Sequence, residues 1–243
     1  MDLKEFSEGF DSLLDSYKLK NTFGEDENLF TLKLDEYEKS LFLTQTQEEL
    51  VYAFYTGKNP LNESYERTEE MRRYLASLNR TIIVSGKDLV ATSKGAAPSS
   101  VIANIKDDNI KRLMFITLEQ CQLDDPEDEC TDGTWVDVIP VKRDIYPNYR
   151  RNPFRTVRVF RIDEAFDRVE LIYKKPIKAY KVSFLSRPTP IILEDLDYVS
   201  IDSYYKAMEC MLPKILHNKI LEAAVAKAYA YLGTRSTQGT KEE

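Results

Sequence analysis

The chain has 243 residues, of which 42% are hydrophobic and 31% charged, and its formal net charge at pH 7 is −7. This composition is typical of a globular chain with one domain or two small ones. The acidic balance argues against a dedicated nucleic-acid-binding protein, though not against a local basic patch. The N-terminus lacks the basic and apolar segments of a signal peptide, and no apolar run approaches the roughly 18 residues of a spanning helix. We therefore expect no secretion by that route and no membrane partner.

The chain begins with an expected N-terminal arm, residues 1–28, which contains one short amphipathic helix. In residues 2–18, apolar side chains recur at the three- and four-residue spacing of one helix face, and these are Phe6, Phe10, Leu13, Leu14 and Tyr17. A polar stretch follows this helix. We expect the main domain to span residues 29–232.

A longer helix is predicted over residues 35–56 by the residues at its two ends. Asp35 and Glu38 have the spacing of an acidic capping box, in which each side chain accepts a hydrogen bond from the other's backbone N–H. At the other end, Gly57 can adopt the left-handed conformation that closes a helix, and Asn59-Pro60 prevents its continuation.

This helix carries apolar side chains on two sides, which is more than one core requires. Tyr37, Leu41, Val51 and Tyr55 lie on one side, whereas Phe42, Leu43, Leu50 and Phe54 fall largely on another. Two interpretations follow. The helix is either sandwiched between two layers of its own domain, or it packs inward on one side and against another subunit on the other.

Beyond this helix the pattern changes from helical to extended. A third helix is predicted over residues 64–78, and a β-rich region over about 80–186 follows it. The region contains seven short runs rich in β-branched and aromatic residues, from which we expect six or seven strands: RTIIVS, DLVAT, RLMFITL, WVDVIPV, TVRVFRI, RVELIYK and YKVSFLS. A last helix is predicted over 214–232, followed by a polar, disordered tail at 233–243. This order predicts an α+β fold, in which the N- and C-terminal helices pack together and a mainly antiparallel β-layer lies between them in sequence.

Candidate catalytic and metal-binding residues are scarce. The single histidine, His217, stands near the start of the last helix, where we expect a capping, packing or exposed role. Gly86-Lys87 does not form a phosphate-binding loop, because Thr81 stands where the first glycine is needed. Three cysteines without a CxxC pair, Cys121, Cys130 and Cys210, indicate free thiols in a reducing cytoplasm.

Two stretches of opposite charge follow one another. The acidic stretch at 124–133 fails as a calcium loop, because Cys130 and Ile139 stand at ligand positions, so we expect a solvated hairpin tip. The basic segment at 142–161 combines aromatic residues with Lys142, Arg143, Arg150, Arg151, Arg155, Arg158 and Arg161. Such a segment suits a protein interface, a DNA-facing surface or a solvated face.

Five segments together resemble the ring proteins of the head-to-tail connector, or neck, in crAss-like and related short-tailed bacteriophages. They are LDEYEKSLFLTQTQEELVYAFYTG, ERTEEMRRYLASL, RRNPFR, YKVSFLSRPTPIIL and ECMLPKILHNKILEAAVAKAYAYL. The resemblance covers roughly residues 30–232. The stretch before residue 30 and the acidic stretch look particular to this chain.

The resemblance implies a structural, non-enzymatic protein of the virion neck or tail, which needs no cofactor and is assembled in the bacterial host cytoplasm. Its partners would be copies of itself in a dodecameric ring, the portal protein, other neck or tail proteins, and double-stranded DNA in a channel below the portal. Tyr37, Leu41, Val51 and Tyr55 then become candidate interface residues. A DNA-binding protein that uses residues 142–161 is the alternative, and an enzyme with paired carboxylates is a third possibility.

Overall fold

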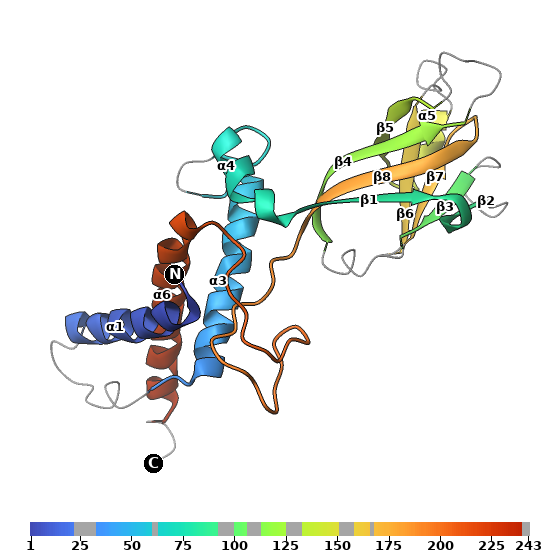
Figure 1. Ribbon diagram of the computed structural model, residues 1–243. Coiled ribbons are helices and arrows are strands. Elements are labelled where there is room, and N and C mark those ends of the chain that lie inside the picture. The colour runs from blue at the N-terminus through green and yellow to red at the C-terminus, as the bar shows by residue number, and fades with distance from the viewer. Residues whose placement is uncertain are drawn as a thin grey trace. The chain divides into compact units, whose positions relative to one another are not determined.

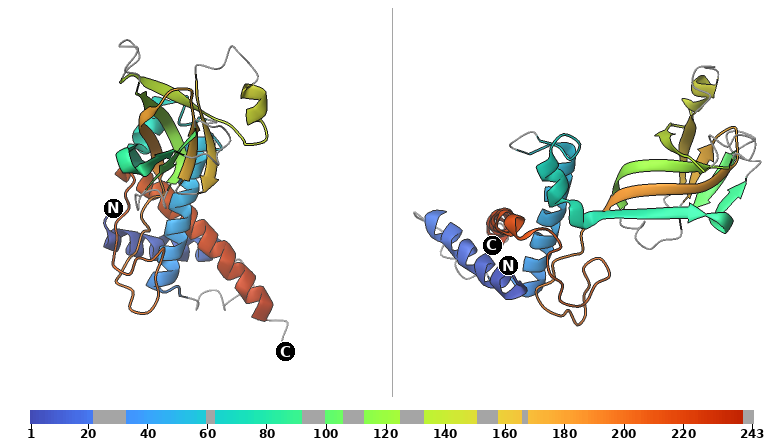
Figure 2. Two further views of the ribbon diagram at one scale, coloured as in Figure 1. Left: turned by 90° about the vertical axis from the view of Figure 1, so that its right-hand side faces the viewer. Right: turned by 45° about the horizontal axis from the view of Figure 1, so that its top comes forward.

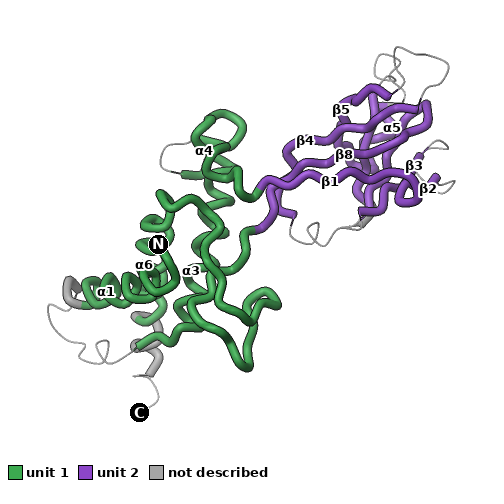
Figure 3. The backbone as a smooth tube through the Cα atoms, in the orientation of Figure 1, with its two compact units in different colours: residues 1–78, 188–243 green, residues 79–187 purple. Residues whose placement is uncertain are grey.

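The computed structural model describes residues 1–21, 33–59, 63–91, 100–105, 113–124, 133–150, 158–165 and 168–239. The chain forms two compact units, drawn in green and purple in Figure 3. Unit 1 contains residues 1–78 and 188–243, and unit 2 contains residues 79–187. The sheet unit is thus inserted between the two parts of the helical unit.

Unit 1 is built on three helices, α1 (Leu3–Asn21), α3 (Glu36–Thr56) and α6 (His217–Gly239). Helix α6 contacts both α1 and α3, as Figure 2 shows, so the prediction that the terminal helices pack together is confirmed. Gly9 allows α1 to approach α6 closely, because a Cβ at this position would lie 2.9 Å from Cδ2 of Leu221. The core of unit 1 includes Phe6, Phe10, Leu43, Phe54, Ile220, Leu221 and Val225, all buried.

Both ends of α3 follow from local chemistry. The backbone N–H of Glu38 donates to Asp35 Oδ1 over 2.7 Å, and the N–H of Asp35 donates to Glu38 Oε2 over 3.3 Å. The predicted capping box is therefore confirmed. At the C-terminus, Gly57 has a φ of 76°, the left-handed conformation that closes the helix.

Two of the helices, α4 and α6, differ from the sequence prediction. The helix expected over residues 64–78 is reduced to α4 (Glu69–Tyr74) and a 3-10 turn, η1 (Ala76–Leu78). Its start is delayed because the N–H groups of Arg67 and Thr68 both bond to the Ser64 carbonyl, each over 3.1 Å, in a separate turn. The last helix follows a 3-10 turn, η5 (Lys214–Leu216), and extends to Gly239, past the end that we expected at residue 232.

Unit 2 contains an eight-stranded mixed sheet (Figure 1) in the order β1-β8-β4-β5-β6-β7-β3-β2. The strands are β1 (Asn79–Ser85), β2 (Leu89–Ala91), β3 (Ser100–Asn104), β4 (Leu113–Leu123), β5 (Trp135–Pro140), β6 (Val159–Ala165), β7 (Arg168–Ile172) and β8 (Ile177–Ser186). Neighbouring strands are antiparallel except for the parallel pair β5 and β6.

The α+β class is confirmed, but the expectation of six or seven strands was wrong. The missed strand is β3, whose short sequence SVIAN lacks the alternation of apolar and polar residues that marks a half-buried strand. The parallel pair requires a crossover, and residues 141–158, with the short helix α5 (Tyr146–Arg150), connect β5 to β6.

The sheet of unit 2 is curled. Its two edge strands, β1 and β2, are consecutive in sequence and joined by one 3-10 turn, η2 (Gly86–Asp88). Four residue steps span at most about 14 Å, whereas the edges of a flat eight-stranded sheet would lie roughly 33 Å apart. The sheet therefore closes toward a barrel around a buried cluster that includes Val84, Cys121, Leu171, Tyr180 and Phe184.

Candidate functional site

The two apolar sides of α3 both have neighbours within unit 1. On one side the helix packs against α6, where Lys227 and Glu49 form an ion pair of 2.6 Å and the rings of Phe42 and Tyr231 lie 5.8 Å apart. On the other side, Tyr37 and Leu41 pack against a cluster of Ile192, Leu196 and Ile201, from the segment that enters unit 1 after the sheet.

Three polar side chains on α3 hold this segment by hydrogen bonds to its backbone. Ser40 accepts from the N–H of Leu193 over 3.0 Å, and Thr44 accepts from the N–H of Ile191 over 3.0 Å. Gln47 donates to the carbonyl of Thr189 over 2.8 Å and accepts from the Cys210 thiol over 3.0 Å. All three are buried. The sequence shows the spacing of three or four residues that places these side chains on one face of the helix, but it does not show their hydrogen-bond partners.

The four candidate interface residues on α3 therefore have intramolecular neighbours. Val51 is fully buried, and Tyr37 and Leu41 are partly covered by the segment described above. Tyr55 stacks on Tyr65 with ring centroids 5.7 Å apart, and burial, together with the charge of Glu66, raises its pKa. Part of the Tyr37, Leu41 and Tyr55 side chains remains accessible, so their place in a subunit interface stays a prediction.

The basic segment divides into residues with different surroundings. Lys142 and Arg158 are exposed, and Arg143 pairs over 3.4 Å with Glu170, whose side chain is fully buried. Arg150 lies in α5, and its side chain is not described. Arg151 and Arg155 lie outside the described residues.

Arg161 belongs to a buried polar network inside the curled sheet. Its Nη1 donates to Glu119 Oε1 over 2.9 Å, and the Tyr180 hydroxyl donates to the same oxygen over 2.5 Å. Burial by itself lowers the pKa of Arg161, but the charges of Glu119 and Asp163 outweigh it and raise the pKa. Burial and the Glu119 charge raise the pKa of Tyr180, which therefore stays protonated as a donor. Arg161 is thus held in a structural network, and only 10% of its side chain is exposed.

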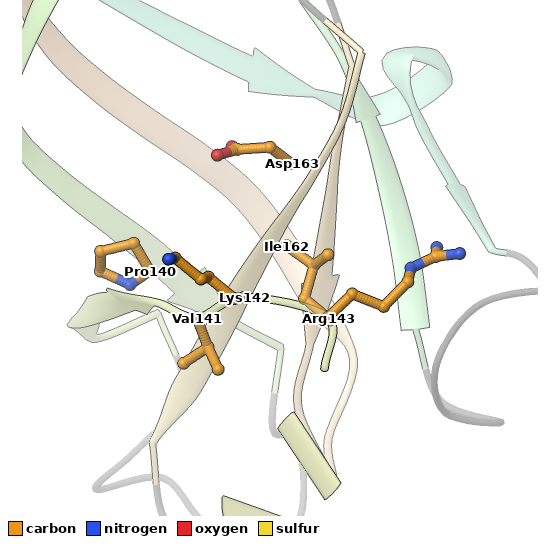
Figure 4. Close-up of a pocket in the computed structure, with 6 residues that line it drawn as sticks. All are labelled: Pro140, Val141, Lys142, Arg143, Ile162 and Asp163. Carbon is orange, nitrogen blue, oxygen red and sulfur yellow. The ribbon is translucent and has the colours of Figure 1, made fainter. Parts of the chain in front are cut away.

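A pocket of about 480 Å³ lies where β5 leads into the basic segment (Figure 4). Pro140, Val141 and Ile162 supply apolar lining, and Lys142, Arg143 and Asp163 supply charge. The side chains of Lys142 and Arg143 extend in different directions. Such a pocket can receive an apolar or aromatic side chain next to a negative charge.

The described residues assemble no recognisable catalytic set. His217 is buried in unit 1, where its Nε2 donates to the Leu212 carbonyl and its Nδ1 accepts from the Met1 amine, each over 2.9 Å. Cys121 and Cys210 are free thiols, and burial raises the pKa of both. Within the described ranges, no three His, Cys, Asp or Glu residues are grouped to hold a metal ion.

Most of the acidic stretch at 124–133 lies outside the described residues, although its base is held by hydrogen bonds between Leu123 and residues 133–134. Across the described part of the chain, no helix has both the length and the apolar character needed to cross a membrane.

Comparison with known proteins gives matches over nearly the whole chain. A family described as phage tail ring protein 3/4 matches residues 1–241. The protein called ring protein 3 of Bacteroides phage crAss001 is 41% identical over 230 residues, which are 93% of this chain and 94% of that protein. A second protein of the same phage, called ring protein 4/5, is 26% identical and covers 95% of this chain and 93% of its own length.

Proposed function

This chain belongs to the phage tail ring protein 3/4 family of crAss-like phages, and on that basis we propose that it is a structural ring protein of the head-to-tail connector. Copies of the chain form a closed, dodecameric ring below the portal protein. The ring continues the channel for double-stranded DNA and contacts other neck or tail proteins. It is a virion component that assembles in the host cytoplasm and performs no catalysis.

The observation that carries this proposal is the 41% identity to ring protein 3, which extends over 93% of the chain. A similarity confined to one unit would support only a shared module, whereas this one includes both the helical unit and the inserted sheet. The second similarity, to ring protein 4/5, covers 95% of the chain and therefore also includes both units.

The direct test is electron microscopy and native mass spectrometry of the chain alone and with the portal protein of its phage. We expect poor oligomerisation alone and closed rings on the portal. Rings in neither condition would contradict the proposal.

The basic segment gives this test a second arm. Replacing Arg150 and Arg151 by Glu should leave the circular dichroism spectrum unchanged. It should reduce the number of rings, because the new glutamates would face the acidic surface of the partner. Normal rings from this variant at physiological salt would make DNA the better partner for the segment.

DNA binding is the second candidate function, and the exposed Lys142 and Arg158 favour it. A salt-dependent gel shift that disappears in Arg150→Ala/Arg151→Ala would support it. A shift that is insensitive to salt and to these substitutions would count against it.

A further inference from the structure

A loop of unit 1 carries aromatic side chains that its own fold leaves exposed. We call residues 192–208 the acidic loop. Tyr198 in this loop is 97% exposed, and Val199 and Tyr205 are 44% and 54% exposed. Large apolar side chains gathered on one short segment are typical of a surface that another molecule covers.

The acidic loop has a defined conformation. Ile192 and Met208 exchange backbone hydrogen bonds of 3.0 and 2.9 Å at its base, and Ile201 and Tyr204 exchange bonds of 3.1 and 2.9 Å across a turn. Between them, the Ala207 N–H donates to Asp195 Oδ1 over 2.7 Å. A preformed loop loses little conformational entropy when it binds, so its exposed tyrosine is suited to serve as an anchor.

The charge of the acidic loop restricts the partner. Lys206 is its one exposed basic residue, whereas its exposed acidic residues are Glu194, Asp195, Asp197 and Asp202. A complementary surface would be a pocket that receives an aromatic ring and has positive charge beside it.

Unit 2 supplies such a surface. The pocket at the end of β5 combines apolar Pro140, Val141 and Ile162 with Lys142 and with Arg143, which is paired with Glu170. Its volume of about 480 Å³ admits a tyrosine side chain. Its acidic member, Asp163, lies 3.2 Å from Arg161 Nε, so part of its charge is neutralised.

The two units also differ in overall charge. Unit 1 contains 25 of the 41 acidic and 15 of the 34 basic residues, whereas unit 2 contains 16 acidic and 19 basic residues. A ring closes through heterologous contacts, in which one surface of each copy meets a different surface of the next. An acidic unit and a basic unit in one chain fit that requirement.

We propose that the acidic loop of one copy docks on the next copy, with Tyr198 inserted into the pocket of Pro140, Val141 and Ile162. Asp197 then lies near Lys142 of that copy and fixes the register. This inference rests on the proposed ring function and adds the contact by which neighbouring copies join.

The first experiment compares ring formation by the full chain and its variants in the presence of the portal protein. Tyr198→Ser should reduce ring formation at least tenfold, the loss typical of a central aromatic anchor. Tyr52→Ser removes a tyrosine that is 46% exposed on α3, outside the loop, and should leave ring formation unchanged.

Charge exchange tests the register. Asp197→Lys and Lys142→Glu should each weaken ring formation, and the double variant should recover most of it, because opposite charges face each other again. Lys174→Glu is the matched control, since Lys174 is an exposed lysine of unit 2 that does not line the pocket.

Cysteine trapping gives an independent readout. Tyr198→Cys combined with Val141→Cys should produce a ladder of cross-linked copies under oxidation, because a disulfide requires Cα atoms within about 7 Å. The wild type and Tyr52→Cys with Val141→Cys should produce none.

Rings by the wild type together with normal rings by Tyr198→Ser would overturn the docking proposal alone. Failure of the wild type to form rings would overturn the proposed function. Loss of portal binding in Tyr198→Ser, with self-association intact, would assign the loop to the portal and also overturn the docking proposal.

Discussion

The ion pair of Glu119 and Arg161 lies inside the sheet unit, where their side chains are 6% and 10% exposed. Removing water from two charges is costly, and their attraction offsets that cost only while both partners are present. Replacing either residue alone should therefore lower the stability of the fold.

The residue-scale prediction is that Arg161→Met lowers the free energy of unfolding by about 3–5 kcal/mol, because Glu119 is then buried without its cation. The double variant Glu119→Gln/Arg161→Met should lose less stability than the single variant, since the neutral amide at position 119 still accepts a hydrogen bond from Tyr180. Urea unfolding measures both. Arg158→Met, at an exposed position, should stay within about 0.5 kcal/mol of wild type. Equal losses from Arg158→Met and Arg161→Met would contradict the prediction.

His217 provides a second residue-scale prediction. Its burial, and the positive charge of the Met1 amine, lower its pKa below the usual value of 6.5, although the Leu212 carbonyl acts in the opposite direction. The unfolded chain therefore binds a proton at a higher pH than the folded chain. The stability tied to His217 is complete above pH 6.5 and decreases as the pH falls from 6.5 toward the lower folded value.

Urea unfolding at pH 7.5 and pH 5.5 checks this sign. His217 is the only histidine, so the wild type should lose more stability between these two pH values than His217→Gln does. The carboxylates titrate in both proteins, so their contribution to the change in stability cancels when the two proteins are compared. Identical losses would show that His217 is not the sensitive group.

At the scale of elements, α3 and the segment after the sheet are held together by side-chain-to-backbone hydrogen bonds as well as by apolar contacts. Thr44 accepts from the N–H of Ile191 and donates to its carbonyl over 3.3 Å. These groups are buried, so each would cost free energy without a partner.

We therefore expect Thr44→Val, which keeps the shape of the side chain but removes its hydroxyl, to cost about 1–3 kcal/mol of stability. Thr56→Val is the matched control in the same helix, because the Thr56 hydroxyl bonds to the Tyr52 carbonyl at an exposed position. Its effect should stay below about 0.5 kcal/mol. Thermal unfolding followed by circular dichroism distinguishes the two variants. Equal decreases in melting temperature would contradict the explanation by a buried hydrogen bond.

At the scale of the whole molecule, unit 2 is a continuous insertion in unit 1. Asn79 pairs with Leu185 at the ends of β1 and β8. Paired residues in an antiparallel ladder lie about 5 Å apart, so the chain enters and leaves the sheet unit at nearly the same place.

This topology predicts that residues 79–187 fold alone, and that a short Gly-Ser linker from Leu78 to Pro188 preserves the helical unit. Circular dichroism should show a β-rich fragment and a helical remainder, each with a cooperative thermal transition. A fragment 79–187 without a cooperative transition would show that the sheet depends on unit 1.

The sequence by itself determined the features that depend on neighbours along the chain. The ends of α3 follow from Asp35, Glu38 and Gly57, because capping joins residues three or four positions apart. The α+β class followed from the change in hydrophobic period, and the resemblance to phage ring proteins followed from the order of five segments.

Tertiary structure decided the features that depend on residues far apart in sequence. The second apolar side of α3 is partly covered by the chain itself, in a segment whose residue Ile191 lies 147 positions beyond its hydrogen-bond partner Thr44. Arg158 and Arg161 belong to one basic run, yet only the pairing of β6 within the curled sheet places Arg161 beside Glu119 and leaves Arg158 exposed. Burial is set by which distant elements pack together, and that information is not contained in local spacing.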